Sequence, residues 1–250
     1  MTGTQYVWHE TPECKDLQYS QIPHLVPGLV RANKDDPLKH YLTDTPDANQ
    51  NPTSARQEKT ALYLFALDSV RRHEGWTVGD GDALLVFSPA SNTVPRRRKL
   101  VNQLFSSVIR SILQMYAMLN TKQQKKRSEE MSTKLQSAQK EALKGREGDL
   151  ISLNLLATAP QKQGRGYASV LVDRLTAIAD AQRRGIWLLT NLYTTGFYER
   201  FGFVTIKDIV LGDDDPTWTK APVIVCIMLR EPGAEPKLPL YSDNKVDLTY

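Results

Sequence analysis

The sequence has few cysteines, no long apolar run and only a small excess of positive charge. Cys14 and Cys226 lie far apart and lack the spacing of metal ligands, so neither a disulfide framework nor a metal site is expected. No run of about 18 consecutive apolar residues is available to span a membrane, and the N-terminus lacks a basic segment followed by an apolar one. These absences predict a cytoplasmic protein without a membrane partner.

The positive charge is concentrated in two short runs. The formal net charge is +4, and residues 96–99 and 122–127 supply much of the surplus. Nucleic-acid-binding surfaces usually interleave such basic residues with aromatic ones, and neither run does so. We therefore interpret both runs as solvated helix faces and expect no nucleic-acid partner.

The first 90 residues predict short elements separated by turns. A short strand is expected at residues 17–19, prolines 23 and 27 argue against an unbroken helix over residues 22–32, and residues 35–52 have the composition of loops. Apolar periodicity then predicts a helix from Ser54 that ends with Gly75 at its C′ position. An Asp-Gly pair between two β-prone runs predicts a hairpin with strands at residues 76–78 and 83–87.

Residues 91–148 are expected to form a helical insertion within a single domain covering residues 1–250. Apolar residues recur at helical spacing from Leu100 to Leu113, which predicts an amphipathic helix that packs through this stripe. Residues 121–144 have sparse apolar positions and are interpreted as a solvated helix or partly ordered excursion. Whether the insertion covers the main domain or is a charged linker stays open, and residues 231–250 are expected to be an irregular tail.

The second half has a sharper pattern, a β-α-β-α-β-β order typical of a layered α/β domain. Its expected elements are a strand at 150–158, a glycine-containing loop at 160–166, a helix at 167–184, a strand at 186–190, a short helix at 195–201, and strands at 204–211 and 223–229. The loop places glycines at a helix N-terminus, where main-chain amides bind phosphate groups. A glycine loop alone is weak support for a phosphate site, and the spacing of a dinucleotide-binding motif is absent.

This loop resembles the acyl-CoA signature of the GNAT superfamily, Gln/Arg-x-x-Gly-x-Gly/Ala. Residues 163–168, Gln-Gly-Arg-Gly-Tyr-Ala, match it, and the preceding Pro160 favours this register over an overlapping match that begins at Gln161. The resemblance implies a GNAT fold, with a mixed central β-sheet flanked by helices and the helical insertion before the acyl-CoA-binding strand. It also implies acetyl-CoA as cosubstrate. The implied cofactor-binding residues are Leu156, Ala157 and Thr158 for the pantetheine arm and Gln163, Gly164, Arg165, Gly166, Tyr167, Ala168 and Ser169 for the pyrophosphate.

A second resemblance lies downstream, where Asn191, Tyr198 and Gly202-Phe203 keep the spacing of a later GNAT pattern. Thr194 stands where that pattern commonly has alanine. The resemblance implies that Asn191 binds the pantetheine or its ordered water and that Tyr198 protonates the departing CoA thiolate. The alternative is that Tyr198 is a core aromatic residue.

A general base is harder to place than the acid. In several GNAT relatives a glutamate on the acyl-CoA strand takes this role, and ungapped counting puts Ser152 at that position with Asn154 on the same face. Neither side chain is a base at neutral pH, although both could hold a water. The carboxylates of the N-terminal loops, including Asp35, Asp36, Asp44 and Asp47, are interpreted as solvated turn residues, and none is assigned as catalytic.

The function predicted from these residues is acetyl-CoA-dependent N-acetyl transfer to a primary amine of a small molecule, by direct attack in a ternary complex. Two alternatives stay open: a protein lysine or N-terminal acetyltransferase, and a non-catalytic acyl-CoA-binding protein. The acceptor, the general base and the oligomeric state are not predicted.

Overall fold

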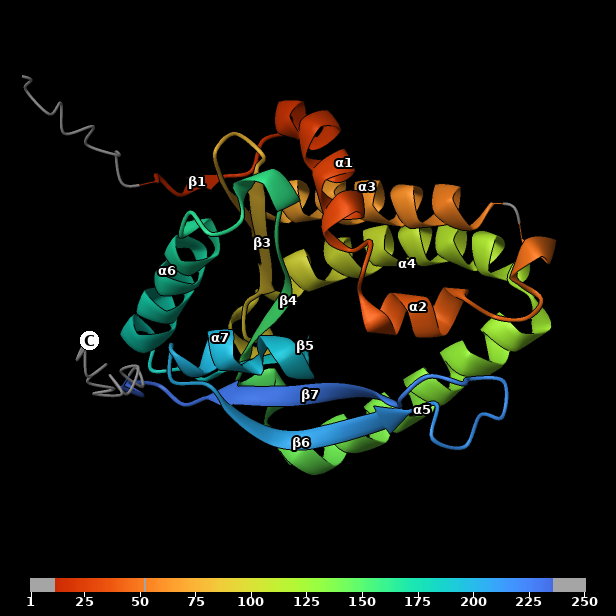
Figure 1. Cartoon of the computed structure of the whole chain (residues 1–250). Coiled ribbons are helices and arrows are strands. Elements are labelled where there is room, and N and C mark those ends of the chain that lie inside the picture. Colours follow the sequence, from red (N-terminus) through yellow and green to blue (C-terminus); the bar gives the residue numbers. More distant parts are fainter. Residues whose placement is uncertain (1–11, 52, 236–250) are drawn as a thin grey trace, which may run out of the picture.

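A computed structural model describes residues 12–51 and 53–235, and much of the predicted tail, residues 236–250, lies outside them. These residues build a seven-stranded sheet in the order β1-β2-β3-β4-β5-β7-β6 (Figure 1). Neighbouring strands are antiparallel except for β4 and β5, which are parallel. The expected mixed α/β fold is confirmed. The strands are β1 Lys15–Asp16, β2 Gly75–Val78, β3 Ala83–Ser88, β4 Ile151–Thr158, β5 Ile186–Asn191, β6 Val204–Leu211 and β7 Val223–Arg230.

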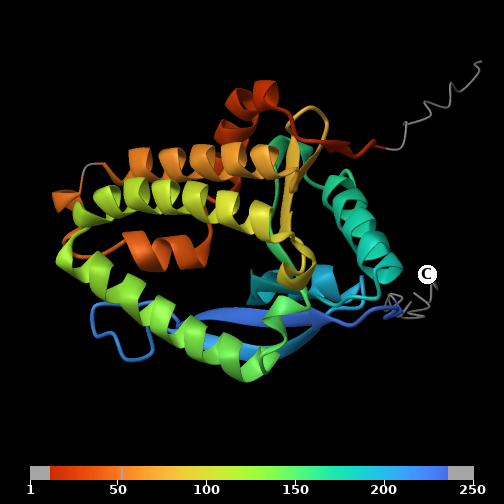
Figure 2. The ribbon, with the colours of Figure 1, turned by 180° about the vertical axis from the view of Figure 1, so that it is seen from behind.

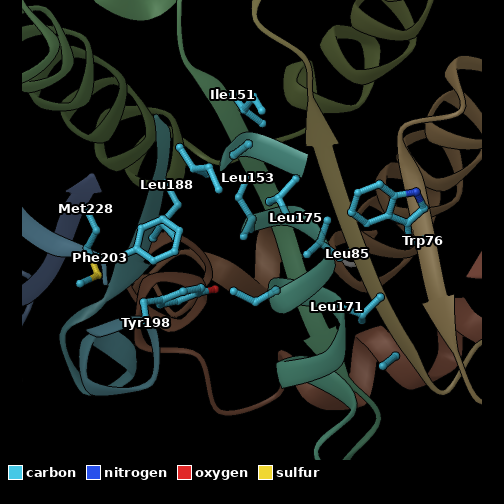
Figure 3. Close-up of a cluster of buried hydrophobic side chains, with 14 of the residues drawn as sticks. Trp76, Leu85, Ile151, Leu153, Leu171, Leu175, Leu188, Tyr198, Phe203 and Met228 are labelled. Atoms are coloured by element: carbon cyan, nitrogen blue, oxygen red, sulfur yellow. The ribbon is translucent and has the colours of Figure 1, made fainter. Parts of the chain in front are cut away.

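Helices cover both faces of the sheet, as Figures 1 and 2 show. One core lies beneath α6 and includes Leu171 and Leu175 of that helix (Figure 3). A second core joins α1 and α3 to β3, and a third lies between α2, α5, β6 and β7. The helices are α1 Ile22–Ala32, α2 Pro37–Thr43, α3 Ser54–Arg72, α4 Arg96–Met118, α5 Lys122–Leu143, α6 Tyr167–Ala181 and α7 Thr195–Glu199.

The expectation that the prolines interrupt the first helix is wrong. Pro23 occupies the first turn of α1, where the N–H that proline lacks would have no intrahelical partner. Pro27 removes one hydrogen bond inside the helix, yet α1 continues because Leu25, Val26 and Leu29 are buried against the second core. Tertiary packing of this face therefore outweighs the local preference.

Two other N-terminal expectations also differ from the structure. The loop predicted for residues 35–52 contains α2, which begins because Asp36 caps the amides of Leu38 and Lys39 with Pro37 in the first turn. The first strand lies at Lys15–Asp16 instead of residues 17–19. These elements are short, so one cap or one strand partner decides their position.

The C-terminal end of α3 also differs from the prediction. His73, in the left-handed conformation with φ 58°, caps the helix, whereas Gly75 begins β2. A Cβ at Gly75 would lie 2.7 Å from Ser69 Oγ. The glycine is therefore required by a close approach of strand and helix.

Helix α4 is present as predicted, but it packs through only part of the Leu100 to Leu113 stripe. Its contact with α3 uses half-buried Ile109 and Leu113 together with hydrogen bonds from Arg71 to Asn102 and from Arg72 to Ser106. Leu100, Val101, Leu104, Phe105 and Val108 are exposed. The periodicity correctly predicted a helix, but several of its apolar residues face solvent.

Helix α5 is attached to the domain by a buried arginine. Arg127 is fully buried; its Nε donates to Asp215 Oδ2 at 2.8 Å and its Nη1 donates to the carbonyl of Tyr41 at 2.7 Å. Burial by itself raises the pKa of Asp215, but hydrogen bonds from Arg127 and Thr217 lower it to about 2. Residues 122–127 are therefore not simply a solvated basic face, because the last of them holds α5 against α2 and the β6–β7 loop.

Replacing Arg127 with Met is expected to lower the free energy of unfolding by about 3–5 kcal/mol, because Asp215 would remain buried without its cation. Chemical denaturation measures this loss. Lys126→Met, at the exposed neighbouring position, should change stability by less than about 0.5 kcal/mol. Adding Asp215→Leu to Arg127→Met should recover part of the lost stability. An equal loss of stability in Arg127→Met and Lys126→Met would show that Arg127 does not attach α5 to the domain.

Candidate functional site

A cavity of about 620 Å³ opens where β4 and β5 separate. The two parallel strands pair only over Ile151–Leu153 and residues 186–188. Beyond that point β4 continues to pair with β3 through Thr158, and β5 continues to pair with β7 through Asn191. The edges of β4 and β5 that face each other there have no strand partner among the described residues, so their main-chain polar groups can bind a ligand in the cavity.

A β-bulge in β4 marks the start of this separation. Leu155 pairs with Val86 and Leu153 pairs with the next residue, Phe87, which leaves Asn154 as the extra residue. Asn154 lines the cavity; its amide donates to Ser88 Oγ at 2.8 Å, and its Oδ1 accepts from Ser152 Oγ at 2.8 Å. The predicted pair is therefore in direct contact, although only Asn154 reaches the cavity.

The glycine loop follows β4 and leads into α6. Gly164 and Gly166 have φ of 74° and 79°, and an added Cβ at either would meet no atom within 4 Å. The open space beside these main-chain atoms is suited to a ligand group. Gly166 is the N-cap of α6 and provides no capping side chain, so the first-turn amides remain available to an anion. Lys162 and Asp82 form an ion pair of 2.9 Å that ties the loop to the β2–β3 hairpin.

One polar atom near this loop lacks a partner. Thr158 lines the cavity, and its Oγ1 is buried without a hydrogen bond to any described residue. Gln163 donates from its side-chain amide to the Thr158 carbonyl at 3.2 Å. Since buried hydroxyls are normally hydrogen-bonded, the unpartnered Thr158 Oγ1 fits a cavity that holds a polar ligand.

Asp36, which the sequence predicted to be a solvated turn residue, lies at this cavity. It is the one charged side chain among the described lining residues. Its Oδ1 caps α2 and accepts from Asn191 Nδ2 at 3.3 Å, whereas no hydrogen bond or ion pair involving Oδ2 occurs within residues 12–51 and 53–235. The Asp-Pro pair is a sequence signal for a helix start, but the contact with Asn191 spans 155 positions and has no local signature.

Tyr198 combines the two roles that the sequence left open. It lines the cavity, and it is also 7% exposed within the first core, with its ring in edge contact with Phe197 and Phe203. Figure 3 shows the ring beside Phe203 with its hydroxyl directed away from it. Burial raises the pKa of Tyr198, and the nearby Thr190 hydroxyl opposes the rise in part. The phenol therefore keeps its proton at neutral pH.

The far end of the cavity is apolar and is lined partly by α5. Met131 and Leu135 of α5 contribute to it. Together with Leu38 of α2 they pack against the core beneath β6 and β7. The cavity therefore joins an apolar region to one carboxylate and a row of neutral polar groups. This arrangement suits a ligand with an apolar body and a cationic group.

The structure brings together eight of the residues predicted from the sequence. Asn154, Leu156, Ala157, Thr158, Gln163, Ala168, Asn191 and Tyr198 line one cavity. Gly164, Arg165, Gly166 and Ser169 lie in the adjoining loop and first helical turn. The Tyr167 side chain is turned toward the β2–β3 hairpin, where it lines a different hollow with Gly79 and Asp80.

Known proteins share both the sequence and the fold of this region. Residues 135–205 match the family model described as an acetyltransferase (GNAT) domain. An uncharacterized N-acetyltransferase of Schizosaccharomyces pombe is 32% identical over 104 residues, which are 41% of this chain and 40% of the relative. The chain thus matches less than half the length of that curated relative.

Solved structures extend the likeness to most of the chain. Arylalkylamine N-acetyltransferase 2 of Aedes aegypti is 13% identical, with a TM-score of 0.53 over 89% of this chain and 99% of that one. A polyamine N-acetyltransferase of Drosophila melanogaster is 14% identical, with a TM-score of 0.53 over 88% and 100%. At such identities the likeness concerns the fold. Residues 135–205 therefore carry the similarity to a GNAT acetyltransferase domain, and most of the chain shares the fold of these acetyltransferase structures.

Proposed function

We propose that this protein is an acetyl-CoA-dependent N-acetyltransferase that acetylates a primary amine of a small molecule by direct attack in a ternary complex. The observation that carries the proposal is one cavity with the glycine loop near one part of it and Asp36 near another. The glycine loop provides main-chain amides for a pyrophosphate. Asp36 provides a negative charge for a protonated amine.

The β5-facing edge of β4 is assigned to the cosubstrate. Main-chain groups of Leu156, Ala157 and Thr158 would bind the pantetheine arm, and residues 163–169 would surround the pyrophosphate through main-chain amides. Asn191 would hold the pantetheine or an ordered water. The unpartnered Thr158 Oγ1 would gain a hydrogen bond in this arrangement.

The chemistry then needs three proton transfers. Asp36 would attract the protonated amine and accept the proton that the nitrogen must lose before attack. The nitrogen attacks the thioester carbon, the C–N bond forms and the C–S bond breaks, and Tyr198 would protonate the departing thiolate. The second proton, which the nitrogen loses after attack, would return to the Tyr198 oxygen. Ser152 and Asn154, hydrogen-bonded to each other and to Ser88, remain candidates for holding a water on the acceptor side.

A small acceptor is favoured over a protein side chain because α2 and α5 both contribute to the cavity. Met131 and Leu135 would contact the apolar body of the acceptor. The mosquito and fly enzymes of similar fold are an arylalkylamine and a polyamine N-acetyltransferase, and both of these acceptor classes are small amines. A non-catalytic acyl-CoA-binding protein would bind the cosubstrate without forming a product.

Following free thiol release from acetyl-CoA with a panel of amines tests the proposal, and Asp36→Asn tests the acceptor site within it. Asn is as good an N-cap as Asp, so α2 should be retained while the charge is lost. We expect kcat/KM for the best amine to fall about tenfold or more, through a higher KM because the charge is lost and a lower kcat because Asn accepts no proton, with the acetyl-CoA KM unchanged.

Asp35→Asn is the matched control, because Asp35 is exposed and does not line the cavity. Equal effects of Asp36→Asn and Asp35→Asn would contradict the proposed role of Asp36 but not the proposed acetyl transfer. Acetyl-CoA binding without product for any amine, lysine peptide or protein N-terminus would reject catalysis and favour the binding protein.

A further inference from the structure

Helix α4 presents an uncovered row of large apolar side chains. Leu100, Leu104, Val108, Met115 and Met118 are between 54% and 75% exposed, and we call them the α4 stripe. Their spacing places them along one side of the helix. From the first to the last, the row is about 27 Å long at a rise of about 1.5 Å per residue. The exposed Ser111 lies within the row between Val108 and Met115. Large apolar side chains gathered on one exposed surface mark an interaction site.

The α4 stripe has no part in the proposed acetyl transfer. None of its residues lines the cavity between β4 and β5. A different side of α4 carries the contacts with α3, through Asn102, Ser106 and Ile109, and the two helices run side by side in Figure 2. The stripe is therefore left over after α4 has packed on the domain.

The sequence around the α4 stripe carries positive charges and no negative ones. Residues 83–128 contain no Asp or Glu. Arg98 is paired with Glu74, and Arg127 is paired with Asp215. The other basic residues of this segment form no ion pair with any residue that the structure describes; they are Arg96, Arg97, Lys99, Arg110, Lys122, Lys125 and Lys126.

We propose that the α4 stripe and these basic residues dock the protein on an anionic phospholipid membrane surface. Such a surface accepts an amphipathic helix lying in its plane, with the apolar side chains among the acyl chains and Lys and Arg at the headgroups. A second copy of this chain would bring two cationic segments together. A nucleic acid would satisfy the charges but leave the protruding leucines and methionines in water.

A fluid lipid surface also fits the shape of the stripe. Leu104 and Met115 are 67% and 69% exposed, so they protrude instead of lining a groove, and lipid needs no complementary shape. None of the helices that the structure describes is long and apolar enough to cross a membrane. The proposal departs from the expectation of no membrane partner, which rested on the lack of a long apolar run and could not foresee which residues remain exposed.

Vesicle co-sedimentation of the full chain tests this docking. We expect binding to vesicles of phosphatidylcholine mixed with phosphatidylserine and little binding to phosphatidylcholine alone. Raising the salt from about 0.05 to about 0.5 M should weaken it strongly, since the Debye length shortens. Leu104→Glu combined with Val108→Glu should lower the apparent affinity by about tenfold or more, and Arg97→Glu should lower it too.

Tyr19→Glu is the control for a charge added at an exposed apolar position away from α4, since Tyr19 is exposed on the first short helical turn; it should have a smaller effect. Acetyl-CoA affinity should be unchanged in every variant, which separates this test from that of the catalytic site. No binding to anionic vesicles at low salt would overturn the proposal. Binding that survives the Leu104→Glu/Val108→Glu change, or a dimer in sedimentation that this change dissociates, would also overturn it.

Discussion

Gly166→Val is expected to weaken acetyl-CoA binding by about a hundredfold or more, or about 2.7 kcal/mol. Gly166 has φ 79° and open space where a Cβ would lie. A β-branched side chain is strongly disfavoured in this conformation, so the loop would change shape. The added methyl groups would also occupy the space proposed for the pyrophosphate beside the first turn of α6. Isothermal calorimetry measures the loss directly.

The matched control is Gly145→Val. Gly145 has nearly the same conformation, φ 80°, and an added Cβ would likewise meet nothing within 4 Å. It does not line the cavity, because it follows α5 on the way to β4. Both variants should therefore lose similar stability, and only the first should lose cosubstrate binding. Unchanged affinity in a folded Gly166→Val protein would remove the glycine loop from the proposed site.

Tyr198→Phe is expected to lower kcat by at least about tenfold and up to about 10⁴-fold, the range of general acid catalysis. The ring would keep its edge contacts with Phe197 and Phe203, so stability should change little. Acetyl-CoA affinity should also be retained. Burial raises the pKa of Tyr198, so the wild-type acid should stay protonated up to at least about pH 10. Loss of the hydroxyl in Tyr198→Phe should therefore lower kcat without shifting the pH optimum.

Thiol release at matched concentrations of folded protein, with a true acceptor present, measures this effect. Tyr193→Phe is the control, because Tyr193 lies in the same segment but is 73% exposed and absent from the cavity lining. Equal rates for wild type and Tyr198→Phe would leave Tyr198 with its packing role alone. Water or the Ser152–Asn154 pair would then be the proton source to test next.

What was predictable from sequence depended on short-range chemistry. The glycine loop could be located because main-chain conformation there is set by the residues themselves, with Gly164 and Gly166 at positive φ. The β2–β3 hairpin followed from its Asp-Gly turn, β4 from its β-prone composition and α6 from its apolar periodicity. These features need only a few neighbouring residues to specify them.

Features that depend on distant residues were not predictable in this way. Asp36 reads as a turn residue, and only folding brings it against Asn191, 155 positions later. Arg127 reads as part of a solvated basic run, but it is buried by α2 and the β6–β7 loop.

Helix α4 also shows what the sequence does not predict. Its apolar periodicity from Leu100 to Leu113 correctly predicted a helix, yet periodicity records only that apolar residues share a side. Which side is covered depends on the partner, and α3 contacts the side with Ser106 and Ile109. The sequence by itself thus determined most of the local elements and the glycine loop before α6, because these arise from main-chain preferences of adjacent residues. Tertiary structure alone decided the position of Asp36 at the cavity, the buried arginine and the exposed stripe, because each depends on contacts between segments far apart in the chain.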